Sequence, residues 1–317
     1  MIYDLVIIGS GAAGLSAAIY AARYKMKSLI IEGEFGGETA TAGKIDNYPG
    51  APAIDGYDLV KTMRTQAEES GVEVKEGWAK EIAKDGECFE VKTDKESYHA
   101  KTVVIAIGSK RRHLGLPNEK ELTGRGVNYC VTCDGPLYGK KIVAMIGGGD
   151  SSVKGVNFLG AYADKIYLLM RGKEVLAEPV NLDQMKALGD KVEILPETEI
   201  KELVGKDKLE KLVLSKEYNG STDLVVDGIF VEIGFDPDTT FAQQLGIDLD
   251  EKNYMKSDNM MRTNVPGIFV AGDATNMFEG FKQDITAAAT GSVAATGAYD
   301  YYKAHGDACE LHGKVAD

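Results

Sequence analysis

Residues 3–14 read YDLVIIGSGAAG, and this stretch decides the fold of the region around it. The uninterrupted apolar run Tyr3–Ile8 predicts a strand buried on both faces, as in a parallel sheet. Glycines at positions 9, 11 and 14 form a G-x-G-x-x-G turn, and small residues continue as a predicted helix to about Tyr24. Such glycines let the backbone approach a pyrophosphate at the helix N-terminus. A second strand, Ser28–Ile31, ends at Glu32, whose carboxylate suits a ribose 2′-hydroxyl.

The same unit returns later in the chain. Lys141–Ile146 predicts a strand, a helix is predicted to about Tyr162, and the turn between them reads Gly147-Gly148-Gly149-Asp150-Ser151-Ser152. The next strand, Lys165–Leu169, ends at Met170. The spacing from the first glycine to the residue that ends the second strand is 23 in both copies. Two matching copies favour two dinucleotide-binding units over glycine-rich turns without a ligand.

Two further segments resemble buried strands. Residues 102–108 form the first of these segments, which contains Ala106 and ends at Gly108. Residues 267–273 are the other, and an alanine-rich helix is predicted to begin near Asp284. The second segment ends in Gly272-Asp273, which places a carboxylate where it can bind a polyhydroxyl chain. The alternative for Asp273 is a plain helix-capping residue.

These segments predict an α/β protein with two Rossmann-like, three-layer dinucleotide-binding domains. The first domain is expected to be discontinuous, with residues 1–112 and 244–317. The second is expected to span 113–243, with short polar strands near 208–215 and 224–233 covering its sheet.

The composition of the chain argues against some classes of function. The chain has 317 residues and a net charge of −13, which argues against a nucleic-acid or anionic-membrane surface. It holds 37 glycines without a collagen period, so tight turns should be frequent. No basic leader opens the sequence and no run of about 18 apolar residues occurs. We therefore expect a cytoplasmic protein.

The four cysteines are too few for a disulfide framework. Cys88 and Cys309 are isolated, with Cys88 in a predicted strand, whereas Cys130 and Cys133 form a C-x-x-C pair. A thiol at a helix N-terminus has a lowered pKa, and the adjacent Asp134 can carry a proton. A zinc site needs about four ligands, so we expect redox chemistry and no metal. Beyond the cysteines the chain offers only the histidines His99, His113, His305 and His312.

In their order along the chain, these motifs resemble those of low-molecular-weight bacterial and archaeal thioredoxin reductases, over almost the whole length. The C-x-x-C-Asp between two dinucleotide units is the most diagnostic feature. The motifs that carry the resemblance are Gly9–Gly14, Gly36-Gly37, Asn47-Tyr48-Pro49-Gly50, Ala106-Ile107-Gly108, Gly124-Arg125-Gly126-Val127, Cys130-Val131-Thr132-Cys133-Asp134-Gly135, Gly147–Asp150, Ile233-Gly234-Phe235-Asp236-Pro237, Ala271-Gly272-Asp273-Ala274 and Lys282-Gln283.

The resemblance implies a homodimer that binds one FAD per subunit in the first domain and reduces a thioredoxin or thioredoxin-like protein. It also implies that Cys133 faces the flavin, that Cys130 attacks the partner's disulfide, and that Asp134 acts as the acid. Glu32 would face the adenosine ribose. The candidate cofactor-binding residues of the first domain are Gly9, Ser10, Gly11, Ala12, Ala13, Gly14, Glu32, Gly36, Gly37, Asn47, Ala106, Gly108, Gly272, Asp273, Lys282 and Gln283.

The second unit departs from the family pattern. Members that use NADPH carry His-Arg-Arg after the second strand and another arginine four residues later, whereas here the residues are Met170, Arg171, Gly172 and Leu176. Arg171, with Lys173 nearby, is the one arginine left to bind a 2′-phosphate, and Ser152 replaces the third glycine. NADPH is the expected donor, with ferredoxin, a reduced deazaflavin or NADH as alternatives. The candidate nucleotide-binding residues are Gly147, Gly149, Asp150, Ser151 and Arg171.

Other functions remain open at this stage. A ferredoxin or flavodoxin–NADP reductase has the same fold but does not need the C-x-x-C. A reductase of a peroxide-reducing system carries an additional N-terminal redox domain, for which Met1 leaves no room. A flavin-binding module that senses redox state is the non-enzyme alternative. Near the C-terminus, His305, Cys309 and His312 are expected to lie in a solvated tail rather than in a metal site.

Overall fold

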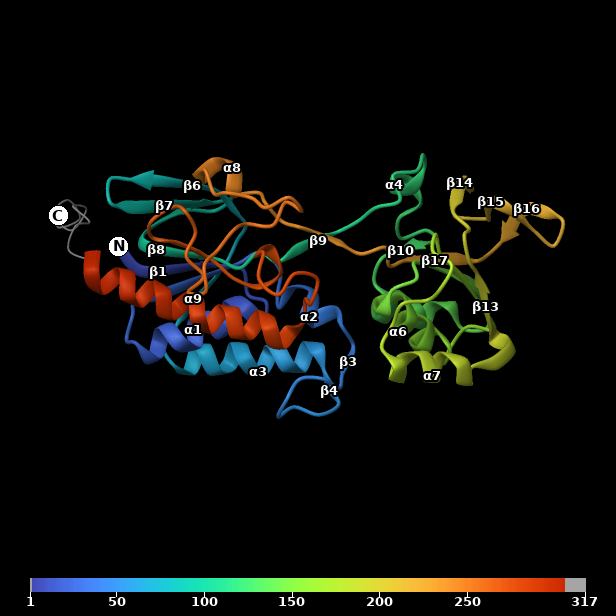
Figure 1. Ribbon diagram of the computed structural model, residues 1–317, viewed down its shortest axis with the longest axis horizontal. Helices are drawn as coiled ribbons and strands as arrows, with labels where there is room; N and C mark the ends of the chain where they lie inside the picture. Colours follow the sequence, from blue (N-terminus) through green and yellow to red (C-terminus); the bar gives the residue numbers. More distant parts are fainter. Residues whose placement is uncertain (1, 306–317) are drawn as a thin grey trace. The chain divides into compact units, whose positions relative to one another are not determined.

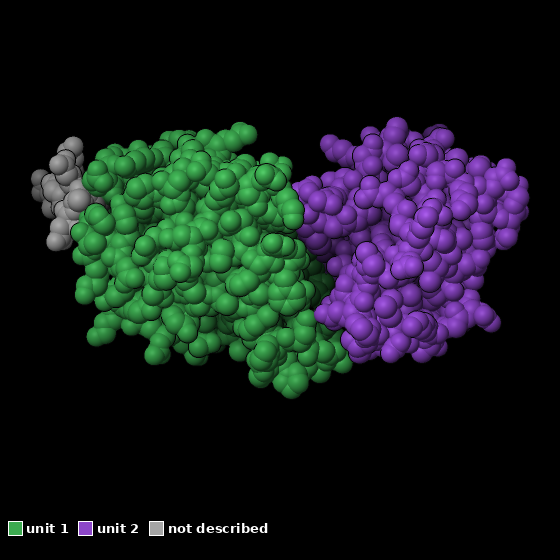
Figure 2. Space-filling model, in the orientation of Figure 1, with its two compact units in different colours: residues 1–110, 237–317 green, residues 111–236 purple. Residues whose placement is uncertain are grey.

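The computed structural model describes residues 2–305. The chain divides into two compact units, residues 1–110 with 237–317 and residues 111–236, which Figure 2 colours separately. The first unit is discontinuous, as the sequence predicts. The chain passes from the first unit to the second after residue 110 and returns to the first after residue 236. The predicted domains ended at residues 112 and 243 instead. The two crossings lie in β9 (Ser109–Arg111) and β18 (Phe235–Pro237), which pair with each other.

A seven-stranded sheet forms the centre of the first unit (Figure 1). Its strand order is β5-β2-β1-β8-β7-β6, and β19 pairs with the last residues of β8. Strands β1, β2, β5, β8 and β19 run parallel, whereas β6 and β7 are antiparallel. The strands are β1 (Ile2–Ile8), β2 (Ser28–Glu32), β5 (Glu73–Glu76), β6 (Ala79–Asp85), β7 (Cys88–Thr93), β8 (Ser97–Ile105) and β19 (Ile268–Val270).

Both faces of this sheet are buried. Leu5 and Ile7 of β1 belong to one hydrophobic cluster, and Val6 and Ile8 belong to another. Because side chains alternate between the faces of a strand, an uninterrupted apolar run is needed to fill both. The continuous run at Tyr3–Ile8 therefore has a direct structural cause.

Three long helices cover one face: α1 (Ala12–Arg23), α3 (Gly56–Glu69) and α9 (Asp284–His305). Figure 1 shows α9 lying along α1. A Cβ on Gly291 of α9 would lie 2.0 Å from the Ala13 carbonyl oxygen, so glycine is what lets these two helices approach so closely. The shorter elements of this unit are α2 (Gly37–Thr41), β3 (Lys44–Ile45), β4 (Ile54–Asp55), α8 (Ala242–Leu245) and the 3-10 turn Gly272–Ala274.

The second unit is built on a five-stranded parallel sheet of order β10-β17-β11-β12-β13. Helices α6 (Asp150–Leu159) and α7 (Pro179–Ala187) pack on one side, where they share a hydrophobic cluster with the sheet. A three-stranded antiparallel sheet shares the cluster on the other side. The strands are β10 (Val127–Asn128), β11 (Ile142–Ile146), β12 (Lys165–Leu169), β13 (Val192–Leu195), β14 (Ile200–Val204), β15 (Lys211–Tyr218), β16 (Ser221–Val225) and β17 (Gly228–Val231).

Two predictions for this unit were wrong in part. Residues 224–233 were expected to cover the sheet, but β17 lies inside it, between β10 and β11. Burial explains the difference, because Ile229 and Phe230 are fully buried and need neighbours on both faces. Helix α6 ends at Leu159 rather than near Tyr162, and Gly160 follows it. The remaining short helices are α4 (Glu119–Leu122), α5 (Val131–Asp134) and the 3-10 turns Gly135–Tyr138 and Gly189–Lys191. Among residues 2–305, no helix is both long and apolar enough to cross a membrane.

Candidate functional site

The three glycines of the first turn have different physical roles. A Cβ on Gly9 would lie 2.3 Å from the Ala106 carbonyl oxygen, and one on Gly14 would lie 1.9 Å from the Gly9 carbonyl oxygen. Both glycines are therefore required by the packing of the turn. Gly11 differs, because its Cβ would meet only the Gly36 carbonyl oxygen, at 3.7 Å. The space over Gly11 is a cradle that a ligand can enter, as a pyrophosphate requires.

The neighbouring candidates of the first unit hold this turn in place. The Ser10 hydroxyl donates to the Glu34 carbonyl oxygen at 3.1 Å and accepts from the Gly36 N–H at 3.4 Å. Gly36 and Gly37 both have positive φ, and α2 begins at Gly37. Ala12 and Ala13, at the start of α1, are buried.

Glu32 ends β2 and is 4% exposed. Its Oε1 lies 2.9 Å from Nη1 of Arg64 on α3, and its buried Oε2 has no hydrogen-bond partner. A buried carboxylate oxygen without a donor is costly to the fold. A ribose hydroxyl would satisfy it, so this residue fits the adenosine half of FAD.

The Asp273 segment lies after β19, and its backbone is held by α9. The Gly272 N–H donates to the Thr290 hydroxyl at 2.9 Å. Burial raises the pKa of Asp273 to about 6, and the nearby Lys282 acts against that rise. The Lys282 ammonium donates to the carbonyl oxygens of Thr275 and Met277 at 2.6 and 3.1 Å. This lysine therefore stabilises the loop that follows Asp273.

Two other candidates that are far apart in sequence meet in the structure. The Asn47 side-chain amide donates to Oε1 of Gln283 at 2.9 Å. Gln283 directly precedes α9. Beyond β8, Ala106 closes on the Gly9 turn as described above, and Gly108 has positive φ with its carbonyl oxygen accepting from Asp238 N–H at 3.1 Å. The first unit thus brings a glycine cradle, a buried acid and these polar groups onto one fold.

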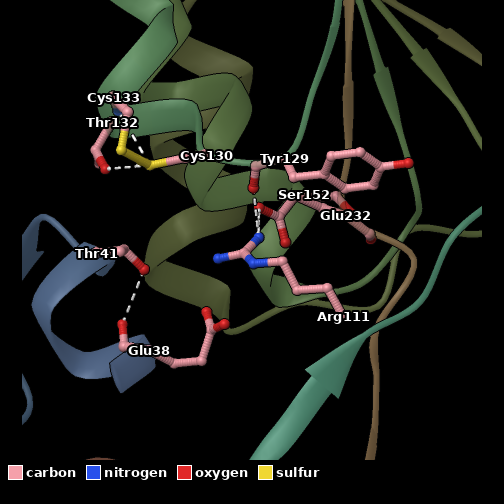
Figure 3. Close-up of polar contacts among 9 residues, drawn as sticks. All are labelled: Glu38, Thr41, Arg111, Tyr129, Cys130, Thr132, Cys133, Ser152 and Glu232. Carbon is pink, nitrogen blue, oxygen red and sulfur yellow. Dashed lines mark hydrogen bonds and ion pairs between the residues drawn. A yellow bond between two sulfur atoms is a disulfide. The ribbon is translucent and has the colours of Figure 1, made fainter. Parts of the chain in front are cut away.

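In the second unit, Cys130 and Cys133 form a disulfide, drawn in Figure 3. Cys130 is the N-cap of α5, and the Cys133 N–H donates to Sγ of Cys130 at 3.2 Å. The Thr132 hydroxyl lies 3.4 Å from the same sulfur. Both contacts are made by groups that can stabilise negative charge on Cys130 once the bond is reduced.

Asp134 is the last residue of α5, and burial raises the pKa of its carboxyl above the usual value. A raised pKa lets this group hold a proton closer to neutral pH than an exposed aspartate does. It is therefore suited to supply a proton during thiol chemistry.

A network beside the disulfide was missed by the sequence analysis (Figure 3). Nη1 of Arg111 donates to the Tyr129 carbonyl oxygen at 2.5 Å and to Oε1 of Glu232 at 2.9 Å. Tyr129 directly precedes Cys130, so the arginine anchors the backbone that enters the redox pair. Arg111-Arg112 has the sequence pattern of a solvated basic pair, and nothing in the sequence distinguishes the buried arginine from the exposed one.

In the second glycine turn, as in the first, one glycine is required by close packing and another leaves open space. A Cβ on Gly147 would lie 2.1 Å from the Glu232 carbonyl oxygen, whereas one on Gly149 would meet nothing within 4 Å. Gly149 has φ of −92°, so it is open rather than strained. The Ser152 hydroxyl donates to the same Glu232 carbonyl oxygen at 2.9 Å. This bond explains why serine is accommodated at the third glycine position.

The segment after β12 is tied to this turn. The Leu176 N–H donates to the Gly148 carbonyl oxygen at 2.8 Å, and the Glu178 N–H donates to Oδ1 of Asp150 at 2.9 Å. Asp150 also accepts from the Asn181 amide and pairs with Lys154. Ser151 is exposed at the start of α6. Asp150 thus organises the turn through its own protein contacts.

Arg171 lies beyond β12 and is exposed, and Lys173 is exposed as well. Within residues 2–305, Arg171 forms no hydrogen bond or ion pair, so its guanidinium is available to an anionic ligand. Met170 is buried against Gly148. Leu176, at the position of the family arginine that follows four residues after the His-Arg-Arg run, is 75% exposed.

Two other sequence expectations concern Cys88 and the residues near the C-terminus. Cys88 begins β7 and is buried, which confirms that it is a strand residue. The expectation that His305 lies in a tail was wrong, because it is the last residue of α9, whereas Cys309 and His312 lie outside the described residues.

Comparison with known proteins adds the family context. The family model for pyridine nucleotide-disulphide oxidoreductases matches residues 3–294. A thioredoxin reductase of Listeria innocua is 36% identical over 312 residues, which cover 98% of this chain and 97% of the relative.

Solved structures agree with these matches. The thioredoxin reductase of Lactococcus lactis superposes with a TM-score of 0.89 at 35% identity, covering 95% of this chain and 99% of that one. A ferredoxin-flavin thioredoxin reductase of Clostridium acetobutylicum matches with a TM-score of 0.51 at 30% identity, covering 96% of this chain and 99% of that one.

Proposed function

The chain belongs to the pyridine nucleotide-disulphide oxidoreductase family, and from this premise we propose that it passes electrons through FAD and the Cys130–Cys133 disulfide to a thioredoxin-like protein. The observation that carries the proposal is the formed disulfide at the N-cap of α5, in a chain whose other unit holds an open glycine cradle. The buried, unpartnered oxygen of Glu32 supports FAD as the ligand of that cradle.

Bound FAD supplies two-electron chemistry between a donor and the disulfide. Reduction of the Cys130–Cys133 bond takes two electrons and two protons and yields two thiols. Asp134, with its raised pKa, provides one of these protons, and solvent provides the other. Cys130 then loses its proton and attacks the partner's disulfide, which forms a mixed disulfide and releases one partner sulfur. Cys133 loses its proton and attacks the mixed disulfide, which re-forms the internal bond and releases the second partner sulfur, and each released sulfur takes up a proton. The two electrons leave with the partner's two thiols.

Replacing either cysteine tests this role. Cys130→Ser and Cys133→Ser should each abolish thioredoxin reduction while leaving FAD bound, because the disulfide belongs to the second unit. Activity is measured as thioredoxin-dependent thiol formation, and FAD content by absorbance. A variant that keeps more than about a tenth of the activity, roughly 1.4 kcal/mol in barrier, would show that its cysteine is dispensable.

For the donor we propose NADPH. Arg171 is exposed and unpaired among the described residues, Lys173 lies two positions on, and Gly149 leaves room for a pyrophosphate. A guanidinium suits a 2′-phosphate because it offers bidentate donors. The donor must poise the flavin near or below about −270 mV, the potential of a thioredoxin disulfide.

One observation favours a second donor. Leu176 stands where the family pattern has an arginine, and it offers a 2′-phosphate no side-chain donor. The Clostridium acetobutylicum neighbour is named a ferredoxin-flavin thioredoxin reductase. The second candidate is therefore the same disulfide reductase driven by ferredoxin, a reduced deazaflavin or NADH.

Anaerobic reduction of the flavin distinguishes the donors. NADPH, NADH and reduced ferredoxin are added separately at equal reducing equivalents, and bleaching of the flavin absorbance is followed. Rapid bleaching by NADPH alone supports the first candidate, whereas bleaching by ferredoxin without NADPH oxidation supports the second.

We further propose that the protein acts as a homodimer in a reducing cytoplasm, where thioredoxin thiols persist. Light scattering of the purified FAD-bound protein tests the dimer, for which a mass near twice the 34.1 kDa chain is expected.

A further inference from the structure

Trp78 is the one tryptophan of the sequence, and it packs on the carboxyl end of β2. A Cβ on Gly33 would lie 2.6 Å from its Cε3 and 2.8 and 2.9 Å from its Cδ2 and Cζ3. All three atoms belong to the six-membered ring of the indole. The ring therefore occupies the space that a side chain at position 33 would need. Gly33 directly follows Glu32, so the indole lies next to the candidate ribose ligand.

The backbone around Trp78 is fixed. Its N–H donates to Oδ1 of Asp94 at 2.8 Å, and its carbonyl oxygen accepts from the Asp94 N–H at 3.0 Å. The Gly77 N–H donates to the Glu32 carbonyl oxygen at 2.9 Å. Even so, Trp78 is 52% exposed. An aromatic side chain has only two rotatable bonds, so on this fixed backbone the indole offers a flat apolar surface at little cost in conformational entropy.

The strand order places this surface at one end of a dinucleotide. The order β5-β2-β1 sets three carboxyl ends side by side, and neighbouring strands lie about 4.8 Å apart. The glycine turn after β1 suits the pyrophosphate, and Glu32 at the end of β2 suits the ribose. The next group of the nucleotide is the base, and the next strand end is that of β5, where Gly77 and Trp78 follow.

We propose that Trp78 is a binding residue for the adenine ring of FAD, which stacks on the indole. The proposal rests on the proposed function, because it requires FAD in the first unit. Stacking of a base on an aromatic side chain corresponds to roughly 5- to 150-fold in a dissociation constant. Gly33 serves the same site, because any larger residue there would displace the indole.

The test is the FAD dissociation constant of the full-length chain, measured from the fluorescence of released flavin. Trp78→Leu and Trp78→Phe form a matched pair, since both keep an apolar side chain over Gly33 but only phenylalanine keeps an aromatic face. Trp78→Leu should bind FAD at least about fivefold more weakly, and Trp78→Phe should stay within about threefold of the unmodified chain. Lys80→Ala is the control, because the Lys80 ammonium lies 6.0 Å from the ring centroid without being part of the stack.

A second readout follows ADP, which carries the adenine without the flavin. ADP should bind the flavin-free unmodified chain at least about fivefold more tightly than it binds flavin-free Trp78→Leu. Equal FAD affinities of the leucine and phenylalanine variants, or equal ADP affinities of the unmodified chain and Trp78→Leu, would overturn the proposal. A chain that takes up no FAD at all would instead overturn the proposed function. Thermal unfolding of each variant verifies that the fold is unchanged.

Discussion

The guanidinium of Arg111 lies 2.9 Å from the carboxylate of Glu232, although 121 positions separate the two residues in sequence. The same nitrogen of Arg111 also binds the carbonyl oxygen of Tyr129, the residue before Cys130. The end of β17 is thereby connected to the backbone of the redox disulfide. Both side chains are largely buried, at 22% and 10% exposure, so the pair is more than a surface ion pair.

Glu232→Ala should destabilise the protein by about 1–3 kcal/mol, because it removes a charged partner from a partly buried guanidinium. It should also slow reduction of the disulfide, because the Tyr129 carbonyl loses a firmly held donor. Urea denaturation measures the first effect, and the rate of thiol formation under a fixed reductant measures the second. Arg112→Ala is the control, since Arg112 pairs with Asp236 at the surface and should change stability by less than about 1 kcal/mol. Equal effects of the two substitutions would contradict this role of Glu232.

Gly11→Ala should leave the fold intact and prevent FAD binding. The added methyl meets only one backbone oxygen at 3.7 Å, but it fills the cradle over the turn. Thermal unfolding and flavin content of the purified protein separate the two effects. Gly9→Ala is the contrasting variant: its methyl would lie 2.3 Å from a carbonyl oxygen, at a φ of +103°, so it should lower stability as well. Retention of full FAD content by Gly11→Ala would show that the cofactor does not approach this glycine.

Arg171→Ala and Gly149→Ala should distinguish contacts with the 2′-phosphate of the nucleotide from contacts with its pyrophosphate. If NADPH is the donor, loss of a charge-assisted bond of about 1.5–3 kcal/mol at Arg171 should weaken NADPH binding by roughly 10- to 150-fold and leave NADH nearly unchanged. Gly149→Ala should weaken both nucleotides, because its methyl enters the open space over the turn. Steady-state kinetics with each nucleotide measures these effects. Thioredoxin reduction by pre-reduced enzyme should survive both substitutions. An unchanged NADPH dependence in both variants would show that neither residue contacts the nucleotide, whereas no NADPH oxidation by the unmodified protein would point to another donor.

Asp273 should make the flavin-free protein more stable at pH 5 than at pH 7. Burial raises its pKa from 3.8 to about 6, so the folded state holds a proton that the unfolded state has released between these values. Stability from this group therefore falls as pH rises through that window. Asp273→Asn should remove the dependence and add up to about 3 kcal/mol at pH 7.5. Urea denaturation of both proteins at pH 5 and pH 7.5 measures the difference, and a gap between the proteins that does not grow with pH would refute the assignment.

Local patterns in the sequence determined much of the fold. The apolar run of β1, the two glycine turns and the start of α9 at Asp284 were all predicted, because each depends on residues that are close together in the chain. The C-x-x-C pair was identified for the same reason, since a short ring between cysteines three positions apart needs only local geometry. The end of α6 and the place of β17 in the sheet were not predicted correctly, because burial against distant strands decided them.

The tertiary structure alone decided which distant side chains meet. The sequence singled out Glu32, but only the fold shows that one of its oxygens is buried without a partner. Arg111, at the end of β9, reaches Glu232, which follows β17 more than a hundred positions later. Trp78 packs on Gly33 because the parallel strands β2 and β5 bring their carboxyl ends to one edge in an order that differs from the order of the chain. No periodicity or spacing encodes that order locally. It follows from how the buried faces of all the strands are satisfied at once, which is a property of the whole folded unit.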